Sequence, residues 1–363
     1  MEIIEILEEL LPIEHPFLVS KIEKDEESKE VHIHLEVDES YRPNSDCGGI
    51  HQYYPRKWEH LKLFEYRSFL HCRLPIYKDI RTGKTQAMQV EFSRKYSRFT
   101  LLYEQELMRL MRLHLNSEAV AAQLQIAQQR VEDIYYHYLQ PAYEAHTVEI
   151  CEKVGLDETS TRKGHNYISV FVNMDTGKPI DIQDGKGIEV VEEFFHNHPN
   201  PTLVTDISID MSPAFISGCE SFFPWARATF DKWHVFKLLG KHLDNLYKRF
   251  KATEHREALF TLSQGLADFY QLKDWMQAKA MLLFLADFAQ FHFGNKNSFS
   301  KSIRRHFDGI VEHMRSKLNN GLLEGINSKI QTIKRIAKGF KNIENFKIRI
   351  LFAFDVIHPQ FYT

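Results

Sequence analysis

The sequence has few cysteines and no long apolar run, and each shortage excludes a class of protein. The four cysteines among 363 residues are scattered, and no two form a C-x-x-C pair. This argues against a disulfide scaffold and against a self-evident zinc site. No apolar segment approaches the roughly 20 residues that span a bilayer, so we expect no membrane helix.

Charge is spread unevenly, although the formal net charge is only −3. The opening residues, MEIIEILEELL, are acidic and lack the basic start of a secretory signal, which favours a cytoplasmic protein. Residues 301–349, by contrast, hold twelve lysines and arginines against four acidic residues. Such a region is typical either of a solvated helical face or of a surface that neutralises nucleic-acid phosphates.

Residues 1–100 have the pattern of a small β-rich module. A short amphipathic helix precedes an alternating strand, VHIHLEVD. Residues 41–100 combine proline, glycine and aromatic residues with short strand-like runs such as YRSFLHCRL and QAMQVEF. Basic side chains that could contact DNA from this module are Arg56, Lys57, Arg73 and Lys78.

Residues 101–150 have a helical pattern, within which Asn116-Ser117 offers an N-cap. The run SEAVAAQLQIAQQRVEDIYYHYL is typical of a helix-turn-helix, with a first helix around Ala119–Leu124 and a second from about Ala127. The second helix of such a unit enters the DNA major groove, although many small helical hairpins share the pattern. The residues that would contact DNA at its start are Gln128, Gln129 and Arg130.

Residues 151–235 alternate between strand and helix patterns, which indicates an α/β layered domain. KVGLDET, NYISVFVN, TLVTDISID and RATFD are strand-like, and MDTGKPI is typical of a hairpin turn. Residues 236–318 are helical throughout, and residues 319–363 add a further helix after an Asn-Asn-Gly break. An all-helical segment is therefore expected between Asp210 and Glu324.

Two carboxylates stand where hydrophobic strands end. Asp157 follows KVGL, and Asp210 closes TLVTDISI. A carboxylate at one strand end usually caps a helix or turn, but strand ends of an open α/β sheet are also where sites form. With Glu324 on a helix beside a basic strip, the set has the oxygen donors that hard divalent cations prefer.

The phrases VGLDET, NYISVFVNMDTG, DISIDMSPAFISG, FDKWHVFKL and NNGLLEGINSKI resemble the DDE transposases of the bacterial ISL-three insertion-sequence family. The resemblance runs from about residue 40 to about residue 352. It is most specific in the ordered D-M-S, D-x-x-H and E-G-x-N motifs. It implies a ribonuclease-H-like α/β domain interrupted by an all-helical insertion and preceded by the β-rich module and the helix-turn-helix.

The resemblance also assigns roles to particular residues. It places the catalytic, metal-binding triad on Asp157, Asp210 and Glu324, with Mg²⁺ or Mn²⁺ as the cofactor and two ions as the expected number. Asp231 and His234 match the D-x-x-H signature shared with Mutator-like relatives and are expected to support the site; helix capping by Asp231 is the simpler alternative.

Three neighbouring residues compete for the same chemistry. Asp206 lies on the same strand face as Asp210, but deeper, and the D-M-S motif marks Asp210 instead. Glu158 is next to Asp157. His165 is expected to be a hairpin residue.

The N-terminal module departs from its relatives, which often carry paired cysteines for zinc. Asn44 and Asp79 stand where cysteines are expected, and only Cys47 remains nearby. One thiolate with Asn and Asp is a poor set for tetrahedral zinc, so we expect the module to keep its shape without zinc.

Basic residues follow Glu324 in KIQTIKRIAKGFKN, and on one helix Lys334, Lys338 and Lys341 would fall close to one side. They could hold phosphates against the carboxylates. The expected DNA-contacting residues of this run are Lys329, Lys334, Arg335, Lys338 and Lys341.

The expected function is a transposase that binds the terminal inverted repeats of its own element, cuts a strand and joins it to target DNA. Its partners would be element ends, target DNA and a second copy of itself in a homodimer or larger assembly, working at the bacterial nucleoid. Two alternatives remain: a metal-dependent nuclease without strand transfer, and a domesticated DNA-binding protein whose site is idle.

Overall fold

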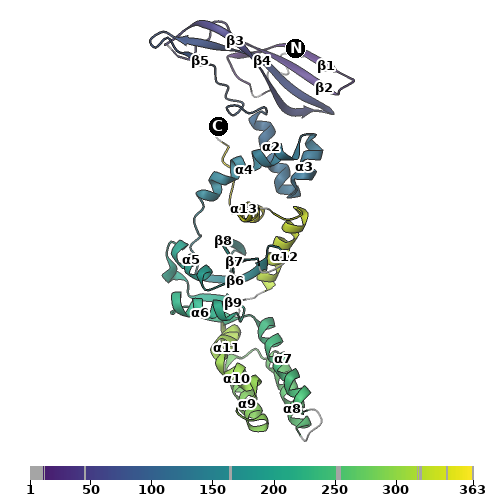
Figure 1. Cartoon of the computed structure of the whole chain (residues 1–363), viewed down its shortest axis with the longest axis vertical. Coiled ribbons are helices and arrows are strands. Elements are labelled where there is room, and N and C mark those ends of the chain that lie inside the picture. Colours follow the sequence, from purple (N-terminus) through teal and green to yellow (C-terminus); the bar gives the residue numbers. More distant parts are fainter. Residues whose placement is uncertain are drawn as a thin grey trace. The chain divides into compact units, whose positions relative to one another are not determined.

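The computed structural model describes residues 11, 13–44, 46–162, 166–250, 255–316, 318, 321–340 and 342–361. The segments expected from the sequence group into two compact units (Figure 1). Met1–Leu139 and Pro359–Thr363 form the first, and Gln140–His358 forms the second. No helix in the described ranges is both long and apolar enough to cross a membrane.

The first unit joins a β-sheet to the helices that follow it. The sheet has the strand order β1-β2-β4-β3, and β5 pairs with β4. Most of its pairs are antiparallel, but β2 and β4 are parallel. The elements in chain order are β1 (Phe17–Asp25), β2 (Glu30–Val37), β3 (Cys47–Leu63), β4 (Tyr66–Asp79), β5 (Thr85–Ala87), α2 (Leu101–His114), α3 (Ser117–Leu124) and α4 (Gln128–Glu144).

The β-rich character of the module is confirmed, but its details differ from the sequence-based expectation. Strands β3 and β4 form one long hairpin rather than short runs, and their residues Trp58, Leu70 and Tyr77 belong to the buried hydrophobic cluster of this unit. Buried and exposed residues alternate only at the start of strand β1, and the sequence did not predict this strand. In QAMQVEF the strand ends at Ala87. The expected N-terminal helix falls almost wholly on residues outside the described ranges.

The helix-turn-helix is confirmed as α3, a three-residue turn and α4. The Asn116 side chain caps α3 by accepting from the backbone N–H groups of Glu118 and Ala119. Gln125, with φ 60°, ends α3 in the left-handed conformation, and α4 begins at Gln128. Leu124, Val131 and Ile134 are buried, so the two helices are fixed by an apolar interface.

The second unit is built on a five-stranded sheet with the order β10-β9-β6-β7-β8. Strands β6, β7 and β8 are antiparallel neighbours, whereas β9 is parallel to β6 and β10 is parallel to β9. The elements in chain order are β6 (Lys153–Ser160), β7 (Tyr167–Asn173), β8 (Lys178–Asp184), α5 (Glu189–Asn197), η1 (Pro201–Leu203), β9 (Asp206–Ile209), α6 (Pro213–Phe222), β10 (Arg227–Phe230), α7 (Lys232–Phe250), α8 (Arg256–Phe269), α9 (Trp275–Phe293), α10 (Ser298–Arg305), α11 (Phe307–Ser316), α12 (Gly321–Ile336) and α13 (Ile343–Ala353).

The mixed α/β expectation for this unit is confirmed. Strand β7 is buried on both faces, which explains its continuous apolar run, and a turn closed by Gly177 at φ 70° connects it to β8. Figure 1 shows α5 and α6 on one side of the strands and α12 on the other. Two helical layers therefore enclose the sheet.

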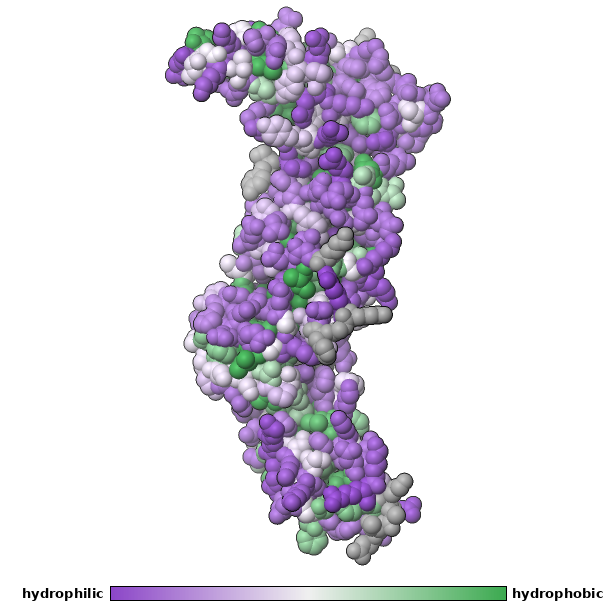
Figure 2. All heavy atoms as spheres, in the orientation of Figure 1, coloured by the Kyte–Doolittle hydropathy of each residue, from purple (hydrophilic) through white to green (hydrophobic). Residues whose placement is uncertain are grey.

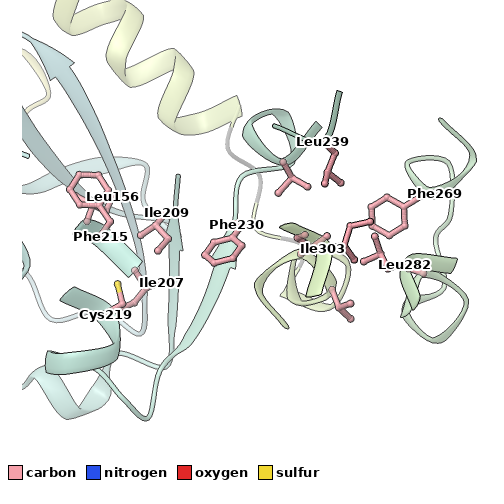
Figure 3. Packing of buried hydrophobic residues seen from close by; sticks show 14 of the residues in the cluster. Leu156, Ile207, Ile209, Phe215, Cys219, Phe230, Leu239, Phe269, Leu282 and Ile303 are labelled. Carbon is pink, nitrogen blue, oxygen red and sulfur yellow. The ribbon is translucent and has the colours of Figure 1, made fainter. Parts of the chain in front are cut away.

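Helices α7 to α11 pack on the β10 end of the sheet through one continuous apolar core (Figure 3). In Figure 3, Phe230 at the end of β10 lies between the sheet residues Ile207 and Ile209 and the helical residues Leu239 and Ile303. A Cβ on Gly309 of α11 would meet the Phe230 ring at 2.5 Å, so only glycine permits this approach. The helical segment is thus anchored directly behind β10.

Candidate active site and nucleic-acid interface

Three aspartates belong to three adjacent parallel strands, Asp157 within β6 and Asp210 and Asp231 directly after β9 and β10. Lys153, Asp206 and Arg227 are register partners at the start of β6, β9 and β10. The pairing of β6 with β9 runs to Gly155 and Ser208, and Asp157, Asp210 and Asp231 each stand four residues after the first paired residue of their strand. The backbone N–H of Asp231 donates to the carbonyl of Ile209 at 3.0 Å, which continues the pairing of β10 with β9 to Asp231.

These aspartates also share one face of the sheet. Leu156, Ile209 and Phe230, each one residue earlier, all enter the core beneath α5, α6 and the helical segment. Since side chains alternate along a strand, the three acids point to the opposite face, where α12 lies. The sheet therefore gathers carboxylates that are distant in sequence.

Burial and neighbouring carboxylates raise the pKa values of the first two acids. Burial, followed by the nearby Asp210 carboxylate, raises the pKa of Asp157 from its ordinary 3.8 to about 6, although the backbone N–H of Glu158 partly offsets this. Burial likewise raises the pKa of Asp210, and the Asp231 carboxylate adds to the rise. Two carboxylates held close together with raised pKa values form a site that gains free energy by binding a cation.

Asp231 and His234 form a hydrogen-bonded pair beside these carboxylates. Asp231 Oδ2 lies 3.0 Å from His234 Nδ1, and its Oδ1 accepts from the Trp233 backbone N–H at 2.7 Å at the start of α7. The hydrogen bond from Asp231 raises the pKa of His234, and Asp210 and Asp157 reinforce the rise. Asp231 therefore caps α7 and also holds the His234 imidazole beside the acidic pair.

Glu324 lies in the first turn of α12, and its side chain is exposed. Across the described ranges, no three histidine, cysteine or carboxylate side chains are gathered closely enough to hold a metal ion. The structure thus brings Asp157 and Asp210 together, and it places Glu324 on the neighbouring helix without joining it to them.

A row of polar residues on α12 faces β6. Asn327 Nδ2 donates to Asp157 Oδ2 at 2.6 Å. Gln331 Nε2 donates to Thr159 Oγ1 at 2.5 Å, and Lys334 Nζ donates to the Ser160 carbonyl at 2.7 Å. Glu324 stands three residues before Asn327, at a spacing that places both on the same helical face.

Close packing holds that face against the strand. A Cβ on Gly155 would lie 2.7 Å from Leu323 Cδ2 and 2.5 Å from Met174 Sδ, so the absence of a side chain on β6 lets α12 approach. Leu323, Ile326, Ile330 and Ile333 are the buried residues of α12. The Glu324 position follows from this packing.

Sequence inspection missed Asn327, Gln331 and Lys186 as parts of the site. The spacing of Glu324, Asn327, Gln331 and Lys334 along one helical face was the available signal. For Lys186 the sequence offered no signal, because this residue follows β8 and comes near the site only when the sheet forms. Its Nζ lies 3.7 Å from Glu158 Oε1. Its charge lowers the pKa of Asp210, against the effect of burial.

Of the rival residues, Asp206 stands four residues before Asp210, whereas Glu158 is close enough to Asp210 for that carboxylate to add to its raised pKa. Asp206 is at the start of β9, where Arg227 donates to its two carboxylate oxygens at 2.8 and 2.7 Å, so it closes an ion pair across the β9–β10 ladder. Burial raises the pKa of Glu158, and its nearest cation is Lys186. His165 lies outside the described residues.

The expected DNA-contacting residues of α4 are exposed at its N-terminus. Gln128 Nε2 donates to Ser117 Oγ at 3.0 Å and therefore links the two helices of the motif. Gln129 Nε2 donates to Asp133 Oδ1 at 2.9 Å, and Arg130 lies 3.8 Å from the same carboxylate group. All three side chains are on the outer surface of the unit.

The basic run after Glu324 does not form the continuous helical face expected from its spacing. Helix α12 ends at Ile336, and Lys338 adopts a left-handed conformation with φ 55°, so Lys338 leaves the face that carries Lys334. Gly339, with φ 92°, follows in a turn. Lys341 lies outside the described residues.

Two other cations of this run contact backbone. Lys334 binds the Ser160 carbonyl, and Lys329 Nζ donates to the Ala353 carbonyl at 2.8 Å. Arg335 is exposed. These contacts join α12 to β6 and to the end of α13.

Asn44, Cys47 and Asp79 are the positions where a zinc-binding set was considered from the sequence. Cys47 is the register partner of Asp79 on β4. Asp79 Oδ1 accepts from the backbone N–H groups of Arg81 and Thr82 at 2.9 and 2.7 Å, which caps the turn after β4. The backbone N–H of Cys47 donates to the Asn44 carbonyl at 3.2 Å. The three positions are thus close together, as parts of a hairpin end.

Comparison with known proteins gives matches to both units. A family model described as a transposase matches residues 154–259 and 246–350, and one described as the helix-turn-helix domain of transposase family ISL3 matches residues 88–139. The transposase for insertion sequence element IS1001 from Bordetella parapertussis is 23% identical over 352 residues, which is 85% of this chain and 86% of that protein.

Among solved structures, the catalytic core domain of BIV integrase is similar to 31% of this chain over 84% of its own length. The sequence identity is 15% and the TM-score is 0.18.

Proposed function

Since the chain belongs to the transposase family ISL3, we propose that this transposase cuts and joins DNA with divalent metal ions held by Asp157, Asp210 and Glu324. Its substrates are the terminal inverted repeats of an insertion sequence and a target DNA. Joining two ends requires at least two copies of the active site, so the working form is a homodimer or a larger assembly, acting at the nucleoid.

The observation that supports this proposal most directly is that Asp157 and Asp210 each stand four residues after Lys153 and Asp206, which are paired across β6 and β9. The Asp210 carboxylate is close enough to raise the pKa of Asp157, and α12 is fixed to Asp157 through Asn327. Glu324 stands one helical turn from Asn327. In this proposal, the exposed Glu324 side chain turns toward the aspartates to complete a three-carboxylate set.

The donor set fits hard divalent cations. Carboxylate oxygens are the ligands that Mg²⁺ and Mn²⁺ prefer, and the nearest cationic groups, His234 and Lys186, leave the acidic pair with raised pKa values. Two such ions, when bound, would activate an attacking oxygen and stabilise the leaving oxygen of an in-line phosphoryl displacement. Asp157, Asp210 and Glu324 would hold them.

The remaining residues of the site orient these ligands. Asn327 fixes one Asp157 oxygen, while the Ser212 backbone N–H donates to Asp210 Oδ1 at 2.8 Å and fixes the other aspartate. Asp231 holds His234 beside the carboxylates, where the imidazole lowers the pKa of Asp157 and of Asp210. We assign both residues a supporting role.

The sheet order supports a ribonuclease-H-like catalytic domain. A three-stranded antiparallel meander, β6 to β8, is extended by the parallel strands β9 and β10. Helices α7 to α11 stand between the second aspartate and α12, in the place of the expected helical insertion. In this scheme the insertion separates the ligands in sequence, and α12 returns to the sheet to restore the site.

Cleavage of a labelled duplex carrying the element end tests the proposal. The full chain with Mg²⁺ or Mn²⁺ should nick the end, and Asp210→Asn should abolish nicking while leaving DNA binding intact. Asp175→Asn is the matched control, because Asp175 is an exposed turn carboxylate paired with Lys153 at 2.9 Å. Undiminished cleavage by Asp210→Asn would refute the assignment.

Strand transfer needs its own assay. A pre-cut oligonucleotide that bears the element end should become joined to a plasmid, giving a product longer than either substrate strand. Cleavage without any joined product would leave a metal-dependent nuclease as the function. No cleavage and no joining, with binding retained, would indicate a DNA-binding protein with an idle site.

A further inference from the structure

A groove of about 1080 Å³ lies within the first unit, between the β-sheet and the helix-turn-helix. Strand β3 and the loop of residues 94–99 form one wall, and the turn at residues 125–127 and the start of α4 form the other. Its basic lining residues are Arg56, Lys57, Arg67, Arg94, Lys95, Arg98 and Arg130. Its acidic lining residues are Glu59 and Asp133.

Some of these cations belong to the framework of the unit. Arg94 donates to both oxygens of the fully buried Glu104 at 2.6 and 2.7 Å, and Arg67 donates to Glu59 at 2.9 Å. Their charges are neutralised within the protein.

Other cations in the groove are presented to solvent. Lys57, Lys95 and Arg98 are exposed, and within the described part of the chain none of them has a carboxylate partner. Lys57 lies 3.8 Å from the centre of the Phe69 ring, and Lys95 lies 5.2 Å from that of Tyr96. The groove therefore offers positive charge that no carboxylate of the described residues neutralises.

Hydrogen bonds to the rest of the unit fix the loop that carries Lys95 and Arg98. Ser97 Oγ donates to Glu104 at 2.8 Å, and Arg56 donates to the Ser97 carbonyl at 2.8 Å. The Arg98 carbonyl accepts from the Glu59 backbone N–H at 2.8 Å. Because the backbone is fixed, the loop loses little further backbone freedom when its side chains bind a ligand.

Tyr96 sits at the tip of this loop in an unfavourable conformation. Its φ is 65°, a region that non-glycine residues adopt at a cost, and its ring is 80% exposed. A large aromatic side chain flanked by two exposed cations is poorly explained by folding. It fits contact with a sugar-phosphate chain.

The opposite wall of the groove is the end of α4 that enters DNA in a helix-turn-helix. Ala127, Arg130 and Ile134 line it. The helix N-terminus adds partial positive charge from its free N–H groups. On the face drawn in Figure 2, hydrophilic residues cover most of the first unit, as a DNA-facing surface requires.

We propose that this groove binds the phosphate backbone of duplex DNA immediately beside the major groove that α4 enters. Lys57, Lys95 and Arg98 contact phosphates, and Tyr96 packs against the sugar-phosphate chain. This inference rests on the proposed function, in which the first unit binds the element ends. It makes the β-sheet and the helix-turn-helix one composite surface, in which α4 reads sequence and the groove supplies sequence-independent affinity.

Salt-dependent binding of the full chain, without divalent metal, tests this surface. Two duplexes are compared, one carrying the element end and one of unrelated sequence. Each phosphate contact contributes about 0.9 to the slope of log K against log salt concentration, so Lys95→Ala/Arg98→Ala should make the slope shallower by about 1.8. Affinity for both duplexes should fall by a similar factor.

The matched control is Lys84→Ala/Arg109→Ala. These two exposed cations of the first unit do not line the groove, and removing them should leave the slope unchanged. Gln129→Ala supplies the opposite signature, a loss of preference for the element end with the slope retained. Equal melting temperatures for all variants exclude a folding defect.

The outcomes separate this inference from the proposed function. If the wild type prefers the element end but the Lys95/Arg98 variant keeps the wild-type slope, the groove assignment is wrong and the proposed function stands. If the control pair changes the slope as much as the groove pair, the charge acts at long range and the groove assignment is also wrong. If the wild type binds neither duplex, both proposals fail.

Discussion

Asn327 on α12 donates a 2.6 Å hydrogen bond to Asp157 on β6, and 170 positions of sequence separate the two residues. This contact closes the second unit after its helical segment has left the sheet. It also fixes the distance between α12 and the carboxylates. The geometry of the site therefore depends on a residue that carries no charge.

Replacing Asn327 tests that coupling. Asn327→Ala should lower the free energy of unfolding by about 1–2 kcal/mol, because a hydrogen bond to a carboxylate is lost in a half-buried setting. In a double-mutant cycle with Asp157→Ala, the two losses should not add, with a coupling energy of about 1 kcal/mol. Urea unfolding measures both values.

Ser328→Ala is the control for this cycle, since Ser328 is the exposed neighbour on the same helix. It should change stability by less than about 0.5 kcal/mol and should not couple to Asp157. Additive losses for Asn327 and Asp157 would mean that the hydrogen bond contributes nothing in solution.

Local pattern predicted much of the fold, and long-range packing explains the rest. The helix-turn-helix followed from Asn116 and from apolar spacing, and the strand ends at Asp157 and Asp210 followed from the hydrophobic runs before them. Strand β1 escaped notice because it is mostly exposed. Helix α12 ends at Ile336, and Lys338 after it adopts a left-handed conformation. The sequence has no helix-stop signal before Gly339, so it did not predict this end.

The candidate site was only partly predictable for a related reason. Asp157, Asp210 and Asp231 become neighbours through the order of β6, β9 and β10, and strand order is not written in any local pattern. Glu324 was found by motif resemblance alone. Its relation to Asn327 becomes meaningful only once α12 is known to pack on β6.

The raised pKa of Asp157 predicts a stability change with pH. An acid whose pKa is about 6 in the folded protein and 3.8 when exposed keeps its proton longer in the folded state, so stability falls as pH rises from about 4 to about 6. Asp157→Asn removes this loss. The variant should be more stable than wild type at pH 8, by up to about 3 kcal/mol, and no more stable at pH 4.

Thermal unfolding at pH 4 and pH 8 in the presence of EDTA measures this difference. Asp175→Asn removes an exposed carboxylate and should behave alike at both pH values. An Asp157→Asn advantage that is equal at pH 4 and pH 8 would show that the substitution acts through packing and not through protonation.

Divalent cations should stabilise the second unit. A ligand that binds only the folded state adds about 2.7 kcal/mol at one hundred times its dissociation constant, so Mg²⁺ or Mn²⁺ should raise the melting temperature at pH 8. Since protons compete for Asp157, the increase should shrink at pH 5. Asp210→Asn should abolish it, and Glu324→Gln should weaken it.

Comparing Glu324→Gln with Asp231→Asn in this cation titration identifies the residue that supplies the third carboxylate ligand. If Glu324→Gln retains the full cation response while Asp231→Asn loses it, the third carboxylate comes from β10 and not from α12. Ca²⁺, which takes oxygen ligands in looser geometry, provides a comparison that separates simple charge neutralisation from a fitted site.

In the first unit, Glu104 should be the most sensitive polar residue. It is fully buried and accepts from Arg94, from Ser97 and from Tyr138 of α4, the last at 2.5 Å. Glu104→Gln removes the charge that neutralises Arg94, so it should cost about 3–5 kcal/mol. Chemical unfolding followed by tryptophan fluorescence measures the loss.

Glu106→Gln provides the comparison, because Glu106 pairs with Arg109 on the exposed face of the same helix. Its expected effect is at most about 1 kcal/mol. Similar losses for Glu104→Gln and Glu106→Gln would contradict the structural role given to the buried carboxylate.

Because the three aspartates are placed by their distance along the strands, a deletion within a strand should damage the site more than a substitution does. Each acid owes its place to standing four residues after a register partner, Lys153, Asp206 or Arg227. A one-residue deletion inside β9 would turn Asp210 toward the apolar face while leaving composition and core volume nearly intact. Codon-by-codon deletion scanning of these strands should therefore show a sharper boundary around the site than substitution scanning does.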